Sequence, residues 1–188
     1  MLIPFEIPMP LEDFLACRGR VEMAPPPRCP ACGDSRVTFA GWWPRLTRLG
    51  PVDIHRVACA GCDTTHSLWP DVLVAGCGDL ADTVGAALQH AAHGAGHRVV
   101  AARSGLAATT VRGWLRRFRR RANDIATRLF AVAASAGGSS VTSGPRSSPL
   151  TTAVAAVGAA TSALAGLSGE PVAPWPFAVR ILRGRLLG

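Results

Sequence analysis

The chain has 188 residues, room for one ordinary domain or two small ones, and a net charge of +8 at pH 7. Its twenty basic residues are all arginines, and nine of them lie in segment 98–128 with a single acid, Asp124. The rest of the chain is balanced, with eleven arginines and eleven acids. A local excess of positive charge is more than solubility requires. It indicates a polyanionic partner, either nucleic acid or an acidic membrane surface.

Residues 1–28 are rich in proline and end in Pro25-Pro26-Pro27. They are predicted to form an extended arm, with a short helical turn at 11–16, that lies against the next module. This segment has an acid at Glu6 and no basic stretch ahead of an apolar one, unlike a secretory signal peptide. Because disulfides persist mainly in secreted proteins, the six cysteines are expected to stay reduced in a cytoplasmic protein.

Two Cys-x-x-Cys pairs, Cys29-Pro-Ala-Cys32 and Cys59-Ala-Gly-Cys62, are separated by 26 residues. Four thiolates at such spacing can surround one Zn²⁺ as a tetrahedron. Alternating apolar residues predict short strands at about 37–42, 54–58 and 64–69. Turns that bind metal and are joined by short strands are the layout of a zinc ribbon, which is predicted over residues 29–70.

Zinc bound by four cysteines has no open coordination position, so the predicted role of the metal is structural. Two alternatives stay open at this point. The pairs could be redox dithiols, although that chemistry needs one pair on a helix after a strand rather than two matched pairs. His66, four residues after Cys62, could replace a cysteine as ligand. Cys17 and Cys77 are interpreted as small buried apolar residues.

The pattern changes to helical at residue 79, and three helices are predicted in the segment 79–134. The first has apolar residues on one face, with Asp79 or Asp82 near its start and Gly94 and Gly96 at its end. The second covers about 98–103. The third covers about 108–134, since nothing breaks it before Gly137-Gly138.

The second and third predicted helices match a helix-turn-helix. Gly105 stands at the turn, and the small residue Ala101 precedes it by four positions. Apolar residues occupy the positions that a three-helix core requires: Val100, Leu106, Val111 and Trp114. A helix-turn-helix places the N-terminal end of its last helix in the major groove of DNA. The alternative is a three-helix packing unit whose arginines are only solvated.

The predicted DNA-contacting residues all lie on the third helix: Thr109, Thr110, Arg112, Arg116, Arg117, Arg119 and Arg120. Arg112 is the candidate for bidentate recognition of guanine, and Thr109 or Thr110 for a phosphate or a thymine methyl group. The arginines from 117 to 121 lie around the helix and cannot all face one groove, so they are assigned mainly to phosphates.

Residues 135–148 have the composition of a linker, and 149–188 are predicted to form an alanine-rich helix and a C-terminal tail. The uncharged run 150–167 has the length of a membrane span. It is rich in small and hydroxylated residues, so a helix packed on the first three is the favoured interpretation. This helix could also serve a homodimer, since helix-turn-helix proteins often read paired half-sites.

The chain resembles a family of small, uncharacterised proteins from high-GC bacteria that join a zinc ribbon to a helix-turn-helix. The matching words are Cys29-Pro-Ala-Cys32-Gly33, Cys59-Ala-Gly-Cys62-Asp-Thr-Thr-His66-Ser-Leu-Trp-Pro70, Gly96-His97-Arg98, Ser104-Gly105-Leu106, the segment 110–118, Pro174-Trp175 and the segment 184–187. The front half is similar to the N-terminal, DNA-binding portion of insertion-element transposases, which implies a regulatory or mobile-element role. One departure is the segment 74–79, which lacks the basic residues typical there.

We therefore expect an α+β protein that binds double-stranded DNA sequence-specifically, contains structural Zn²⁺, and has no catalytic residues and no small-molecule substrate. A full transposase is not expected, because metal-dependent strand transfer needs clustered carboxylates and the twelve acids here are scattered. Two alternatives remain: an adaptor whose ribbon binds a polymerase or recombinase subunit, and a non-catalytic transposase remnant.

Overall fold

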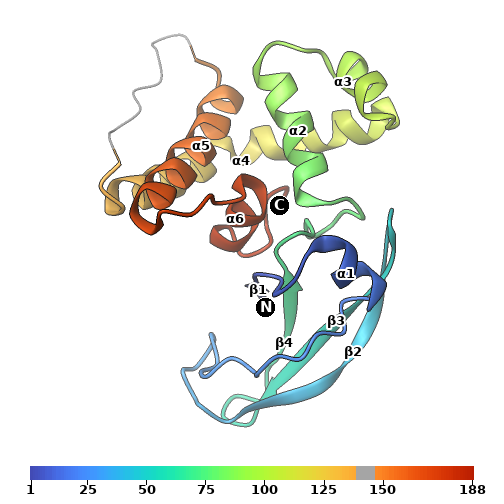
Figure 1. Ribbon diagram of the computed structural model, residues 1–188, viewed down its shortest axis with the longest axis vertical. Coiled ribbons are helices and arrows are strands. Elements are labelled where there is room, and N and C mark those ends of the chain that lie inside the picture. Colours follow the sequence, from blue (N-terminus) through green and yellow to red (C-terminus); the bar gives the residue numbers. More distant parts are fainter. Residues whose placement is uncertain (139–146) are drawn as a thin grey trace.

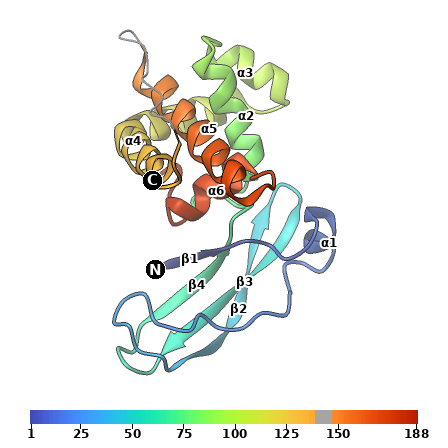
Figure 2. The same ribbon diagram turned by 60° about the vertical axis from the view of Figure 1, so that its left-hand side comes forward.

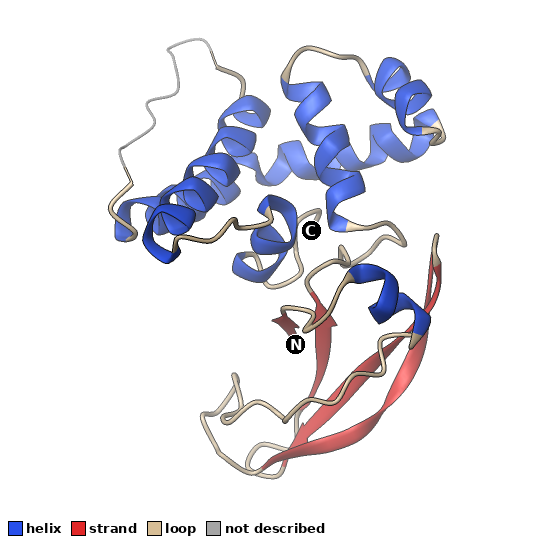
Figure 3. Cartoon of the chain, viewed as in Figure 1, coloured by secondary structure: helices blue, strands red, loops and turns tan. Residues whose placement is uncertain are grey.

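The computed structural model describes residues 1–138 and 147–188 (Figure 1). Within them are a four-stranded sheet and six helices, so the predicted α+β class is confirmed. The sheet occupies one end of the molecule and the five larger helices the other, as the colouring by secondary structure makes clear (Figure 3). The predicted linker at 135–148 includes residues 139–146, which lie outside the described ranges.

The sheet is built on a long hairpin of β2 (Val37–Thr47) and β3 (Gly50–Cys59), followed by β4 (Thr65–Pro70) antiparallel to β3. β2 and β3 contain the first two predicted strands and are much longer than expected, and β4 is shifted by one residue from the third. Pro44 is accommodated because β2 is an edge strand and pairs on one side only. The Thr47 hydroxyl donates to the Gly50 carbonyl (2.7 Å) and so closes the turn.

The N-terminal arm is more ordered than the composition predicted. Its first residues form β1 (Leu2–Phe5), a parallel neighbour of β4, and the strand order is β1-β4-β3-β2. The short helix α1 (Leu11–Ala16) covers the range expected for it, and Figure 2 shows the arm running along the sheet. The expectation of an extended arm did not include this pairing, in which Leu2–Phe5 meets a strand more than sixty residues away in the sequence.

Two arginines of the arm bind one buried acid of the sheet. Arg20 Nε lies 2.7 Å and Arg18 Nη2 3.2 Å from the two carboxylate oxygens of Asp53, whose side chain is fully buried. Close packing supports the same attachment, since a Cβ atom on Gly19 would lie 2.8 Å from Val52 Cγ1. The arm is therefore fixed to the sheet by charge and by packing.

The helical half begins with α2 (Ala81–Ala92), α3 (His97–Ser104) and α4 (Ala108–Ser135). Their bounds agree closely with the helices predicted from periodicity. Asp79 lies just before α2, near its start as expected; the N-cap is Leu80, and the Asp79 carboxylate binds Arg48 of the hairpin turn. Asp82 lies in the first turn, where an acid interacts favourably with the helix dipole.

Two further helices complete this half: α5 (Pro149–Ser168) packs along α4, and α6 (Pro174–Ile181) lies between the helices and the sheet (Figures 1 and 2). Ser148 caps α5 by accepting a hydrogen bond from the Thr151 amide (3.2 Å). Among the described helices, α5 has the length and hydropathy of a membrane span, which is weak evidence because core helices share both properties. One of its faces, including Ala153 and Ala160, is buried.

The buried apolar residues form two clusters of very different size. The main core joins α1, the half of the sheet nearer the helices and all five larger helices. The second core lies at the far end of the sheet and consists of Cys29, Val37, Val57, Cys59 and Leu68. So small a core buries too little apolar surface to order the loops around it. Two of its five residues are the cysteines Cys29 and Cys59.

Candidate metal centre and arginine surface

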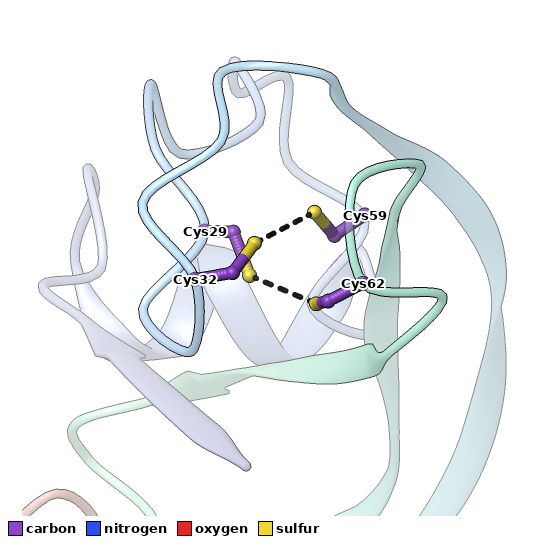
Figure 4. Close-up of side chains that lie close together, drawn as sticks. All are labelled: Cys29, Cys32, Cys59 and Cys62. Carbon is purple, nitrogen blue, oxygen red and sulfur yellow. Dashed lines mark hydrogen bonds between the residues drawn. The ribbon is translucent and has the colours of Figure 1, made fainter.

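The two Cys-x-x-Cys turns face each other at the end of the sheet that is remote from the helices (Figures 1 and 4). Cys29 and Cys32 lie in the loop before β2, Cys59 ends β3, and Cys62 lies in the turn before β4. All four sulfur atoms lie within 4.8 Å of one another. The structure thus brings together the four residues predicted to hold a metal ion.

The sulfur separations suit a tetrahedral ion. Cys29 Sγ and Cys62 Sγ are 3.8 Å apart, and Cys32 Sγ and Cys59 Sγ are 3.6 Å apart. Four thiolates at a Zn–S distance of about 2.3 Å would have sulfurs about 3.8 Å apart. A disulfide needs about 2.05 Å, and all six cysteines are free thiols.

Backbone hydrogen bonds hold each cysteine loop in a tight turn. The Cys29 amide donates to the Asp34 carbonyl (2.8 Å), and the Gly33 amide donates to the Cys29 carbonyl (2.8 Å). Gly33 has φ of 78°, a conformation that glycine adopts without strain. The loops also touch: a Cβ atom on Gly61 would lie 2.3 Å from Asp34 Oδ2. Glycine at position 61 is therefore required for the two loops to meet.

The four thiols perturb one another's ionisation. Hydrogen bonds from Thr64 and from Cys32 lower the pKa of Cys62 to about 7. At Cys32 a hydrogen bond from the Asp34 backbone lowers the pKa, but the neighbouring thiols and burial outweigh it and raise the pKa to about 12. Thiolates this close repel one another, so full ionisation requires a cation among them.

His66 lies at the edge of this cluster and was the alternative ligand. Its side chain is buried, and its Nε2 atom lies 3.2 Å from Cys29 Sγ, within hydrogen-bonding distance. Burial lowers the pKa of His66, which favours the neutral imidazole. Its Nδ1 atom has no hydrogen-bond partner within residues 1–138 and 147–188. The position fits a hydrogen-bond donor to the Cys29 sulfur rather than a ligand in place of a cysteine.

The turn between α3 and α4 is three residues long and has the features expected of its sequence. Gly105 adopts the left-handed conformation with φ of 64°, and the Leu106 amide donates to the Ala101 carbonyl (3.1 Å). Ala101 is 4% exposed, so the helices approach closely there. Val100, Val111 and Trp114 are buried, as predicted for the core of this unit.

The exposed side of α4 carries a stripe of polar residues. Successive residues of a helix are rotated by about 100°, which puts Thr109, Arg112, Arg116, Arg119 and Arg120 within roughly 100° of one another. We call these five residues the arginine stripe, and all five are exposed. Its four arginines form no ion pair with any residue that the structure describes. Thr109, Arg112, Gly113 and Arg116 line a shallow hollow of about 460 Å³.

Two predicted DNA contacts lie away from this stripe. Thr110 is half-buried and points to another side of α4. Arg117 is also half-buried, and its Nη1 atom lies 3.5 Å from the Gly76 carbonyl. Arg121, which was grouped with the phosphate contacts, binds Asp124 (3.1 Å) on the opposite side of the helix. The stripe therefore comprises five of the seven predicted residues.

No family model, curated protein or solved structure matches this chain.

One arrangement between the sheet and the helices was not predicted. The segment before α2 is held by the turn of the β2–β3 hairpin: Arg45 Nη2 donates to the Cys77 carbonyl (2.8 Å), the Arg48 amide donates to the Gly78 carbonyl (2.8 Å), and Arg48 binds Asp79. These contacts join the two halves of the molecule. In the sequence these contacts correspond only to two arginines, Arg45 and Arg48, in one segment and an acid, Asp79, in another.

Proposed function

We propose that this protein binds double-stranded DNA through α4, contains one structural zinc ion, and catalyses no reaction. The observation that carries the proposal is the arginine stripe, where four exposed arginines, without ion pairs to any described residue, occupy one side of a single helix. A solvated helix surface usually mixes both signs of charge. An unpaired basic stripe instead fits the phosphate backbone, from which it releases counterions.

The connection between α3 and α4 supports a helix-turn-helix as the means of binding. In such a unit the last helix enters the major groove with its N-terminal residues toward the base edges. Arg112 would then contact guanine, and Thr109 a phosphate or a thymine methyl group. Gly113 has open space where a side chain would be, so the backbone of α4 can approach the duplex closely. Arg119 and Arg120 would bind phosphates farther along.

The cysteine cluster supports zinc in a structural role. The sulfur separations of 3.6 and 3.8 Å are those of a tetrahedral thiolate site, and four cysteines leave no position for a substrate. The neighbouring core is small, so metal binding would supply much of the stability of this end. The biological setting that fits is a transcriptional regulator or an accessory factor of a mobile element, acting in the cytoplasm.

The test is selection of bound duplexes from a random DNA pool with zinc-loaded protein, followed by binding measurements on the enriched sequence. Arg112→Ala with Arg116→Ala should weaken binding by about tenfold or more and lower the salt slope by about two. The matched control is Arg28→Ala with Arg56→Ala, which removes two exposed arginines near the sheet. Equal losses in both double variants, or no enriched sequence, would contradict the proposal.

A second candidate function is an adaptor that binds another protein through its sheet. One observation favours it: β2 is an edge strand with exposed apolar side chains, including Phe39, Trp42 and Leu46. Such an edge can pair with an extended segment of a partner. If the pool yields no sequence while Trp42→Ala abolishes capture of one defined partner, the adaptor is the better assignment.

A further inference from the structure

A second basic surface lies where α4 meets the tail that follows α6. It is a hollow of about 320 Å³ lined by Arg121 and Arg128 of α4, by Arg183 and Arg185 of the tail, and by Met1, Leu2 and Leu182. We call it the tail hollow. Its four arginines come from segments more than fifty residues apart, so the fold and not the local sequence gathers them.

The tail arginines are held in place by the chain around them. Leu182, Leu186 and Leu187 are buried, so the tail is anchored on both sides of its arginines. Arg183 and Gly184 both have positive φ, of 52° and 76°, and form a tight turn whose Gly184 amide donates to the Val179 carbonyl (2.8 Å). Arg183 and Arg185 are exposed at this turn.

The positive charge of the tail hollow is only partly compensated. Asp124 contacts both α4 arginines, Arg121 at 3.1 Å and Arg128 at 2.8 Å. Arg183 and Arg185 form no ion pair within the described ranges. The Arg121 Nη1 atom is buried and has no hydrogen-bond partner there either. Among the residues that the structure describes, the uncompensated charge of the hollow therefore lies on Arg183 and Arg185.

The tail hollow is separate from the arginine stripe. Arg121 follows Arg112 by nine residues, or about two and a half turns, which puts it on the opposite side of α4. A duplex lying against the stripe would not reach it. The charge at this second surface is therefore not explained by the proposed DNA contact.

We propose that the tail hollow binds a compact oligophosphate, either free or as the phosphate chain of a nucleotide. Guanidinium groups bind phosphate oxygens in pairs of parallel hydrogen bonds, and four of them can surround several phosphoryl groups. The hollow is about ten times the volume of one water molecule, which leaves room for such an anion. The inference does not depend on DNA binding.

The test is calorimetric titration of the whole chain with inorganic tripolyphosphate. Arg183→Gln with Arg185→Gln should weaken tripolyphosphate binding by about tenfold or more, since each charge-assisted contact contributes substantially. The control, Arg119→Gln with Arg120→Gln, removes the same charge from the other side of α4. It should change the affinity for tripolyphosphate by less than about twofold. Both pairs are exposed, so each variant should fold, and thermal melting checks this.

Duplex binding by the same variants distinguishes an oligophosphate site from a contact with the DNA backbone. Wild-type protein that ignores tripolyphosphate, or equal losses in the two double variants, overturns the inference. It is also overturned if Arg183→Gln with Arg185→Gln weakens duplex binding and leaves tripolyphosphate binding unchanged, because the hollow would then serve the DNA backbone. Failure of duplex binding in wild-type protein contradicts the proposed function alone.

Discussion

The indole of Trp175 lies directly on Gly85. A Cβ atom at position 85 would lie 2.1 Å from Cδ1 and Cγ of that ring, so no side chain fits there. Trp175 is 4% exposed, which means that it cannot move away into solvent. This contact fixes α6 on α2 and thereby positions the tail that follows α6.

Gly85→Ala is expected to destabilise the protein by roughly 1–3 kcal/mol, the usual cost of overpacking a core. Urea unfolding followed by circular dichroism measures this. The matched control is Gly158→Ala on α5, where a Cβ atom has open space. There alanine should stabilise by roughly 0.5–1 kcal/mol through helix propensity. Equal stability of the two variants would contradict the packing of Trp175 on α2.

Metal removal should destabilise the cysteine end of the sheet. We expect the purified protein to contain one zinc ion per chain, and Cys32→Ser to bind zinc more weakly and to melt at a lower temperature. The shift is about 2–4 °C for each kcal/mol lost in a chain of this size. Cys17→Ser is the control, since Cys17 lies outside the four-thiol cluster. A full zinc content in Cys32→Ser would show that the ligands are misassigned.

His66 is expected to act on the metal through Cys29. Loss of a hydrogen bond to a metal ligand typically weakens metal binding by about 10–100-fold. We therefore expect His66→Phe to keep zinc but to lose it to a chelator at a lower chelator concentration, while His93→Phe, an exposed position on the helical half, is unchanged. Complete loss of zinc in a folded His66→Phe variant would instead make His66 a ligand.

Asp71 should make stability depend on pH. Burial raises its pKa from 3.8 to about 6, although Arg180 lies 3.4 Å away and opposes the shift. Because the folded state holds the proton more tightly, the free energy of unfolding should fall as the pH rises from about 4 to about 6. Asp71→Asn should flatten this fall, and the exposed Asp13→Asn should not. An unchanged slope in Asp71→Asn would show that another group titrates.

Much of the fold was predictable because its signals are local. The Cys-x-x-Cys spacing predicted the four residues that now cluster, and apolar periodicity placed α2, α3 and α4 within a few residues of their bounds. Gly105 marked a turn that does need a left-handed residue. Each cysteine pair, each helical repeat and the turn glycine is a short-range signal, and only the meeting of the two pairs joins positions 26 residues apart.

The features that were missed all depend on contacts between distant segments. β1 looks like part of a proline-rich arm until β4 is placed beside it. Asp79 was expected only to lie near the start of a helix, whereas its carboxylate binds Arg48, more than thirty residues earlier. The tail hollow gathers arginines from positions 121 to 185. Periodicity reports which side of an element is buried and not what buries it, so these arrangements required the three-dimensional structure.

The unequal size of the two apolar cores has a consequence for how the molecule opens. The large core holds the helices and the near half of the sheet, whereas the small one depends on four thiols and a few side chains. Amide hydrogens in the cysteine loops should therefore exchange with solvent through local fluctuations, long before those of α4 exchange through global unfolding. Oxidants and competing metals would reach the buried sulfur atoms of Cys29 and Cys59 by that same opening, while α4 stays intact.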